Sequence, residues 1–175
     1  MSDLFHKDIP REFIDRVFET MEQADQHIYQ VLTKRSSLLR KYVNDRYPNT
    51  PAPDHIWLGV SVEDRDHASR IRHLRDANAS IRFISFEPLL GAIGHVDLSE
   101  IAWAIVGGES GPRARPMDPD WARELRDQCQ AQDVAFFFKQ WGGARPKSGG
   151  RELDGEIWDG YPVDRLNAKT AIAFT

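Results

Sequence analysis

The sequence predicts an α/β fold, a partial βα barrel with mainly parallel strands and flanking helices, followed by an irregular C-terminal appendage. Five short apolar runs alternate, for the most part, with segments whose apolar residues recur at helical spacing. Each run ends in polar residues, as strands do at the ligand-binding edge of βα barrels and doubly wound sheets. The chain has 175 residues, enough for one domain but short of the about 250 that a complete eight-stranded barrel needs.

The N-terminal part is expected to contain a helix and then one βα unit. Asp8 marks the start of a helix that runs to about residue 23, because its apolar residues form one stripe. Residues 27–32 (HIYQVL) form the first predicted strand. Ser36 or Ser37 is expected to cap the helix that follows.

The middle of the chain supplies three more strands. Residues 47–54 include three prolines, which exclude a helix interior or a central strand, so they are expected to form a loop. Residues 56–62 and 81–86 are predicted strands, with a helix between them over about residues 63–76. The apolar run 101–106 is the next strand, and it leads into a glycine-rich loop.

The last elements are a helix, a strand and a hairpin. Asp118 is a predicted N-cap, and a proline in the first turn supports that start. Cys129 is expected in the core, residues 134–138 form the fifth strand, and Asp154-Gly155 suits a two-residue hairpin turn. We therefore divide the chain into a partial barrel over residues 1–146 and an appendage, hairpin and partly ordered tail, over residues 147–175.

Composition limits the classes of function. The net charge is −4 with a pI near 5.9 and interspersed signs, so no global basic field indicates nucleic acid, although a local patch stays open. Cys129 is the only cysteine, which excludes an intrachain disulfide and a cysteine-only cluster, and the six histidines lack zinc-type spacing, so no metal site is expected. Without a signal-peptide pattern or an apolar stretch of about 20 residues, we expect a cytoplasmic protein that does not enter membranes.

Polar residues at the strand ends are the main functional signal. Alternation along two strands places Ser61 and Glu63 on one face and Ser85 and Glu87 on the same face, so these four side chains are expected to line one lumen. The alternative is that they are ordinary helix caps and solvated loop starts, because strand ends are polar in many folds.

Single residues at these ends have two interpretations each. Glu87 is either an acid, base or ligand contact, or a carboxylate satisfied by neighbouring backbone. Gly107 and Gly108 either let a ligand approach or only make a tight turn, with Glu109 as a contact for an amine. Lys34 and Lys139 either contact a carboxylate or phosphate of a ligand or are ordinary solvated lysines. Trp141 either stacks on a ring of a ligand or forms a hydrophobic lid.

Eight segments resemble a known family. They are MSDLFH, VLTKR, WLGVSVE, RFISFEPLLG, WAIVGGESGPRARPM, WARELRDQC, FFFKQWG and GRELDG. In order, and from residue 1 to about 162, they are similar to the bacteriophage family named for gene products thirty-seven and sixty-eight, a domain of unknown function. The resemblance implies a partial barrel like that of radical S-adenosylmethionine enzymes, with a [4Fe–4S] cluster on an upstream cysteine-rich segment that this chain lacks. It also implies that the chain begins inside the barrel and that the triplet at Gly107 is similar to a motif that holds the methionine amino group.

Three functional hypotheses follow. The first is the C-terminal part of a radical-S-adenosylmethionine-like barrel without cluster chemistry or a cofactor of its own. Its catalytic candidates are Glu87, Glu109, Lys139 and Lys34, and its binding candidates are Ser61, Glu63, Ser85, Gly107, Gly108, Ser110 and Arg115. The second is a nucleotide or nucleic-acid binding module that uses Lys34, Arg35, Arg113, Arg115, Lys139 and Trp141. The third, a metal-independent hydrolase or lyase, has no nucleophile-and-base pairing in the sequence.

Strand number carries a further expectation. Five strands cannot close a barrel of the usual eight, so unpaired strand edges are expected. A missing N-terminal segment, a partner protein or self-association would cover them.

Overall fold

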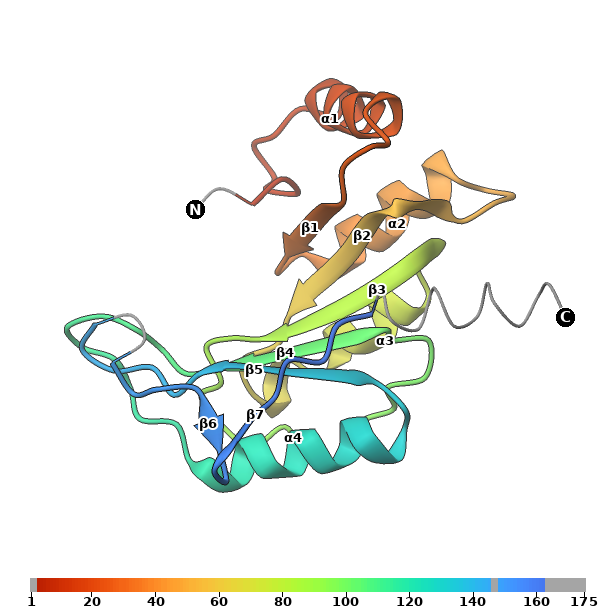
Figure 1. The fold of residues 1–175 in the computed structure, drawn as a ribbon. Helices are drawn as coiled ribbons and strands as arrows, with labels where there is room; N and C mark the ends of the chain where they lie inside the picture. Colours follow the sequence, from red (N-terminus) through yellow and green to blue (C-terminus); the bar gives the residue numbers. More distant parts are fainter. Residues whose placement is uncertain (1–2, 146–147, 163–175) are drawn as a thin grey trace, which may run out of the picture.

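The structure, a computed structural model, describes residues 3–145 and 148–162 (Figure 1). Its centre is a five-stranded sheet in the order β1-β2-β3-β4-β5, and all four strand pairs are parallel. The predicted α/β fold with a mainly parallel, barrel-like sheet is therefore confirmed. The strands are β1 (Tyr29–Thr33), β2 (Ala52–Ser61), β3 (Ala79–Phe86), β4 (Trp103–Gly107) and β5 (Ala135–Gln140).

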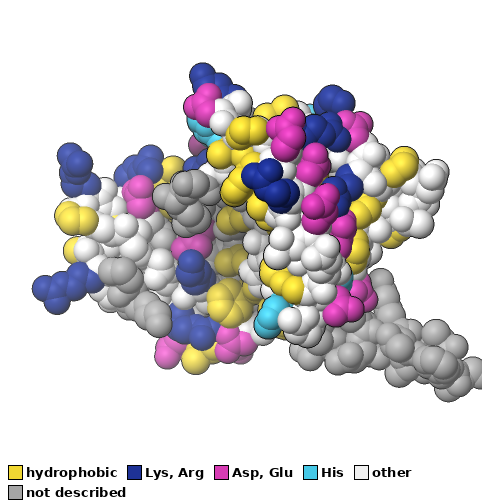
Figure 2. Space-filling model, turned by 90° about the horizontal axis from the view of Figure 1, so that it is seen from above, with side chains coloured by type: hydrophobic (Ala, Val, Ile, Leu, Met, Phe, Trp, Pro, Cys, Tyr) yellow, Lys and Arg dark blue, Asp and Glu magenta, His cyan; other side chains and the backbone are white. Residues whose placement is uncertain are grey.

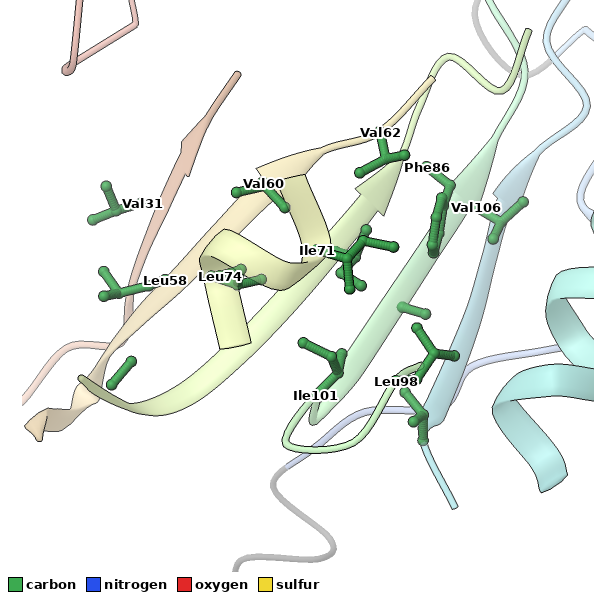
Figure 3. Close-up of a cluster of buried hydrophobic side chains, with 14 of the residues drawn as sticks. Val31, Leu58, Val60, Val62, Ile71, Leu74, Phe86, Leu98, Ile101 and Val106 are labelled. Carbon is green, nitrogen blue, oxygen red and sulfur yellow. The ribbon is translucent and has the colours of Figure 1, made fainter. Parts of the chain in front are cut away.

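The helices all pack on one face of this sheet. They are α1 (Arg11–Gln23), α2 (Ser36–Arg46), α3 (Ser69–Arg75) and α4 (Pro119–Ala131), with a short 3-10 turn η1 (Arg65–His67) before α3. One core contains side chains of every α-helix together with alternate residues of each strand. Figure 3 shows part of this core, where Ile71 and Leu74 of α3 lie over Leu58, Val60 and Phe86. Parallel strands in sequential order are joined by crossovers of one hand, which place the connecting helices on one side, and no helix of residues 3–145 and 148–162 covers the other face.

The predicted helix ends are partly confirmed. Asp118 accepts a hydrogen bond from the backbone N–H of Asp120, as expected for the N-cap of α4. Ser36 begins α2 but does not cap it, because its hydroxyl lies 2.9 Å from Nδ1 of His73 instead. Cys129 is fully buried in α4, as predicted.

The start of β2 differs from prediction. The strand begins at Ala52, inside the stretch expected to be a loop, and so includes Pro53. Pairing with β3 is shifted between Ala52 and Trp57, and a proline is tolerated at such an irregularity because the ladder is already interrupted there. The proline-rich stretch is therefore a loop only over its first five residues, 47–51.

The helix-free face carries its own apolar cluster. Trp57, Ile81, Phe83, Trp103 and Ala135 are buried there, with no helical residue among them. Tyr161 packs on the rings of Trp57 and Trp103, with centroids 5.3 and 5.1 Å away. The face opposite the helices is thus covered in part by the C-terminal segment.

The segment after β5 is built into the domain. Antiparallel strands β6 (Glu152–Leu153) and β7 (Glu156–Ile157) form the predicted hairpin, and Asp154 and Gly155 have the positive φ of 58° and 80° that its turn needs. Leu153 is fully buried in the main core. Residues 163–175, the rest of the predicted tail, lie outside the described residues.

The two outer strands differ in their free edges. The N–H of Phe138 donates to Trp158 and that of Gly160 donates to Phe136, both at 2.9 Å, so the outer edge of β5 is covered. Within residues 3–145 and 148–162, β1 pairs only with β2. Leu32 of β1 pairs with Gly59 on the helix-free face and is 38% exposed.

The described helices are not of a kind that crosses a membrane. In the part of the chain that the structure describes, none of them combines the length and apolarity needed to cross a bilayer.

Candidate site at the carboxyl ends of the strands

The helix-free face changes from apolar to charged toward the carboxyl ends of the strands. One row across the sheet contains Gly59, Phe83, Trp103 and Ala135, and here a Cβ on Gly59 would lie 2.4 Å from the Phe83 ring. The next row contains Ser61, Ser85, Ile105 and Phe137. Glu63 and Glu87 follow two residues after Ser61 and Ser85, just beyond the ends of β2 and β3. The alternation therefore places Ser61 and Ser85 on one face, whereas Glu63 lies after the strand and contacts Arg70 of α3.

Glu63 is a buried carboxylate held by two cations. Its side chain is 5% exposed, Arg70 donates to Oε2 at 2.8 Å, and Lys34 makes an ion pair with Oε1. Burial alone would raise the pKa of Glu63, but the hydrogen bond and charge of Lys34, and then the charge of Arg70, lower that pKa below 4.5. Arg70 was not a sequence candidate, because nothing in the helical pattern of α3 distinguishes it from a solvated arginine.

Glu87 and Lys139 form the second pair at this edge. Lys139 Nζ donates to Oε2 of Glu87 at 2.8 Å, and the two side chains are 51% and 20% exposed. Gly107 of β4 lies between their strands, and a Cβ there would be 3.3 Å from Cδ of Glu87. The missing side chain of Gly107 therefore leaves room for Glu87 to reach across β4 to β5.

The carboxylate of Glu109 accepts all of its hydrogen bonds from one residue, Arg115. Arg115 donates to it from the backbone N–H, from Nε and from Nη2, at 2.9, 2.8 and 2.7 Å. The side-chain hydrogen bonds of Arg115, followed by its backbone N–H, lower the pKa of Glu109 to about 2. Both oxygens of Glu109 are therefore used within the loop that follows β4.

The glycine-rich loop after β4 packs against the loop after β5. A Cβ on Gly108 would lie 2.0 Å from the carbonyl oxygen of Trp141, and one on Gly142 would lie 2.2 Å from that of Glu109. The N–H of Gly108 donates to Gln140 at 2.9 Å, and Nε2 of Gln140 donates to Ser110 Oγ at 2.8 Å. The backbone of the neighbouring loop occupies the space beside Gly108, so close backbone packing explains why glycine is needed there.

Trp141 is anchored in the fold. Its indole N–H donates to the carbonyl of Glu152 at 2.7 Å, and its ring lies 4.8 Å from that of Phe138. This arrangement corresponds to the hydrophobic-lid interpretation.

The cations of the nucleic-acid hypothesis are mostly paired. Arg35 contacts Asp3 at 2.8 Å, and Lys34, Arg115 and Lys139 contact the three glutamates already described. Arg113 has no ion-pair partner in residues 3–145 and 148–162. Figure 2 shows basic and acidic side chains close to one another on the face it displays. Pairing of this kind weakens the positive potential that a nucleic-acid site needs.

Two further sets of donor groups do not form a site. No group of three or more His, Cys, Asp or Glu side chains is arranged to hold a metal ion in the described part of the chain. Ser36 and His73 form a hydroxyl–imidazole pair that the sequence pattern did not reveal, because 37 positions separate them. Ser36 is 5% exposed and links α2 to α3, so it lacks the access that a nucleophile needs.

Comparison with known families adds one result. The profile of a family described as "Protein of unknown function (DUF5131)" matches residues 1–162. The chain belongs to the DUF5131 family. No curated protein and no solved structure matched it. Membership confirms the predicted relation to a family of unknown function.

Proposed function

We propose that this DUF5131 protein is a phage-type protein that forms part of a radical-S-adenosylmethionine-like βα barrel and binds a small ligand at the carboxyl ends of β1 to β5. The observation that carries the proposal is a parallel sheet in sequential order, with helices on one face, Ser61 and Ser85 on the other, and Glu63 and Glu87 just beyond the carboxyl ends of β2 and β3. Ligands of βα barrels bind at this edge. The outer edge of β1, which no strand of the described residues pairs with, fits a barrel that further strands complete, from a preceding segment, a partner protein or a second copy.

The donor set of this chain does not fit an iron–sulfur cluster. Such clusters are held by several cysteine thiolates, whereas Cys129 is a single residue buried in α4. The triplet Gly107–Gly108–Glu109 does not fit a contact to the methionine amino group either, because Gly108 faces backbone and Glu109 is saturated by Arg115. The proposal therefore includes no cluster chemistry by this chain alone.

Anaerobic reconstitution tests the absence of a cluster. The chain is incubated with ferrous iron, sulfide and dithionite, desalted, and assayed for bound iron and for cluster absorbance. We expect no cluster, and the same background of iron on a Cys129→Ala control. A cluster with stoichiometric iron would overturn this part of the proposal.

Hydrogen exchange tests the position of the ligand site. With S-adenosylmethionine as the probe, we expect slower exchange in the segments that follow β2, β3 and β5. Slower exchange only at the opposite edge of the sheet, or no change at the carboxyl ends, would count against a barrel-type site.

The nucleotide or nucleic-acid module is our second proposal and has less support. It rests on the number of cations at the same edge, most of which are neutralised by carboxylates. Salt-sensitive binding to single-stranded DNA that weakens in Arg115→Ala would favour it. Absence of binding at low salt would exclude it.

A further inference from the structure

The three carboxylates at the strand ends differ in how fully they are used. Glu63 has a cation on each oxygen, and both oxygens of Glu109 accept from Arg115. Glu87 accepts one hydrogen bond, at Oε2 from Lys139, and its Oε1 has no partner in residues 3–145 and 148–162. Lys139 in turn uses one of its three N–H donors in this pair. Glu87 and Lys139 thus retain an acceptor and donors side by side.

Two serines that are almost fully buried lie next to this pair, on the same edge of the sheet. Ser61 and Ser85 are register partners on β2 and β3, with 5% and 4% of their surface exposed. Neither hydroxyl hydrogen-bonds to another group in the part of the chain that is described. Neither oxygen is among the fully buried side-chain atoms that lack a partner, so each hydroxyl reaches the surface and is open to a hydrogen bond with a bound molecule. Ser85 is two residues before Glu87, about 7 Å along the chain.

The surface beside these hydroxyls is mainly apolar, although the guanidinium of Arg151 lies over part of it, 5.2 Å from the centre of the Phe137 ring. Ile105 and Phe137 continue the row of Ser61 and Ser85 across β4 and β5, and both are partly exposed. The row therefore offers hydrogen-bond donors at one end and apolar contact at the other, directly below a carboxylate and an ammonium group.

We propose that this arrangement binds an α-amino acid with an apolar side chain. The ligand ammonium donates to Oε1 of Glu87, and the ligand carboxylate accepts from Lys139. Ser61 and Ser85 provide further donors, and the side chain lies on Ile105 and Phe137. A zwitterion fits better than an anion because Glu87 would repel a second negative charge. The inference rests on the proposed ligand site and specifies what that site recognises.

Calorimetric titration of the whole chain tests this assignment. The probes are L-methionine and L-phenylalanine, compared with N-acetyl-L-methionine, which lacks the ammonium group, and L-methioninamide, which lacks the carboxylate. We expect the free amino acids to bind and each blocked form to bind at least about tenfold more weakly, as loss of a charge-assisted hydrogen bond predicts. Equal binding of the blocked forms, or no binding of the free amino acids, would overturn the assignment.

Variants identify the residues. Glu87→Gln and Ser85→Ala are each expected to weaken L-methionine binding, by at least about tenfold and a few-fold respectively. Lys41→Met, which removes a lysine charge from the surface pair with Asp45 on α2, is the matched control and should not change it. A circular dichroism melt confirms that each variant is folded. Binding that is unchanged in Glu87→Gln and Ser85→Ala overturns the amino-acid assignment, whereas the position of the ligand site is judged separately by hydrogen exchange.

Discussion

Substitution of the two adjacent glycines after β4 should have very different effects on stability. A Cβ at Gly108 would lie 2.0 Å from the oxygen and 2.6 Å from the carbon of the Trp141 carbonyl. Both are backbone atoms, so the loop after β5 must move by about 1 Å to restore normal contact. A Cβ at Gly107 would lie 3.3 Å from the side chain of Glu87, which can shift by rotation.

The size of the difference follows from these contacts. Gly108→Ala forces apart two loops joined by the 2.9 Å hydrogen bonds from Gly108 to Gln140, from Gly111 to Gly143 and from Gly143 to Glu109. Overpacking costs about 1–3 kcal/mol and each weakened hydrogen bond about 1 kcal/mol, so we expect a loss of about 3 kcal/mol. Gly107→Ala should change the free energy of unfolding by less than about 1 kcal/mol. Alanine lowers the conformational entropy of the unfolded chain, and this gain offsets the small cost of the close contact between its Cβ and Glu87.

Urea unfolding followed by tryptophan fluorescence measures both variants. The midpoint of Gly108→Ala should fall well below that of Gly107→Ala, with similar slopes for the two transitions. Equal midpoints would refute the argument that backbone packing, and not the approach of a ligand, requires glycine at this position.

Three further predictions concern single contacts. Glu63→Gln should lower the free energy of unfolding by about 2 kcal/mol, because Lys34 and Arg70 lose their carboxylate. The pKa of Glu63 in the folded protein lies below its usual value of 4.5, so its stabilisation is complete above about pH 4.5 and is lost as the pH falls further. Plots of unfolding free energy against pH for wild type and variant should therefore converge in acid. Parallel plots would contradict this. An NMR titration should give Glu109 a pKa of about 2, and Arg115→Ala should raise it toward 4.5; an unchanged value would mean that Arg115 does not contact it in solution. Leu153→Ala should cost about 3 kcal/mol in a thermal or urea unfolding experiment, because this side chain is fully buried, and a cost below about 1 kcal/mol would mean that the hairpin does not dock on the core.

The sequence predicts which polar residues lie at the strand ends but not how they pair. Alternation along β2 and β3 places Ser61 and Ser85 on one face because side chains in a strand point to opposite sides in turn. The partners of Glu63 and Glu87 could not be read from the same pattern. Glu87 and Lys139 are 52 positions apart, and only the pairing of β3 and β5 on either side of β4 brings them together.

The glycine-rich loop illustrates the same limit. Its sequence is compatible with a ligand-binding turn or with close backbone packing, since glycine serves both. The carbonyl of Trp141, which comes from the loop after the next strand, fills the space beside Gly108. That neighbour is fixed by the parallel pairing of β4 with β5.

The sequence by itself determined the fold class, the order of the elements, the cap at Asp118 and the hairpin turn at Asp154, because these depend on local periodicity and on residues close in the chain. Tertiary structure decided the entry of Pro53 into β2, the docking of Leu153 in the core, and which strand-end carboxylate keeps an unpaired oxygen. Each of these depends on distances between residues far apart in the chain, which only the packed sheet defines.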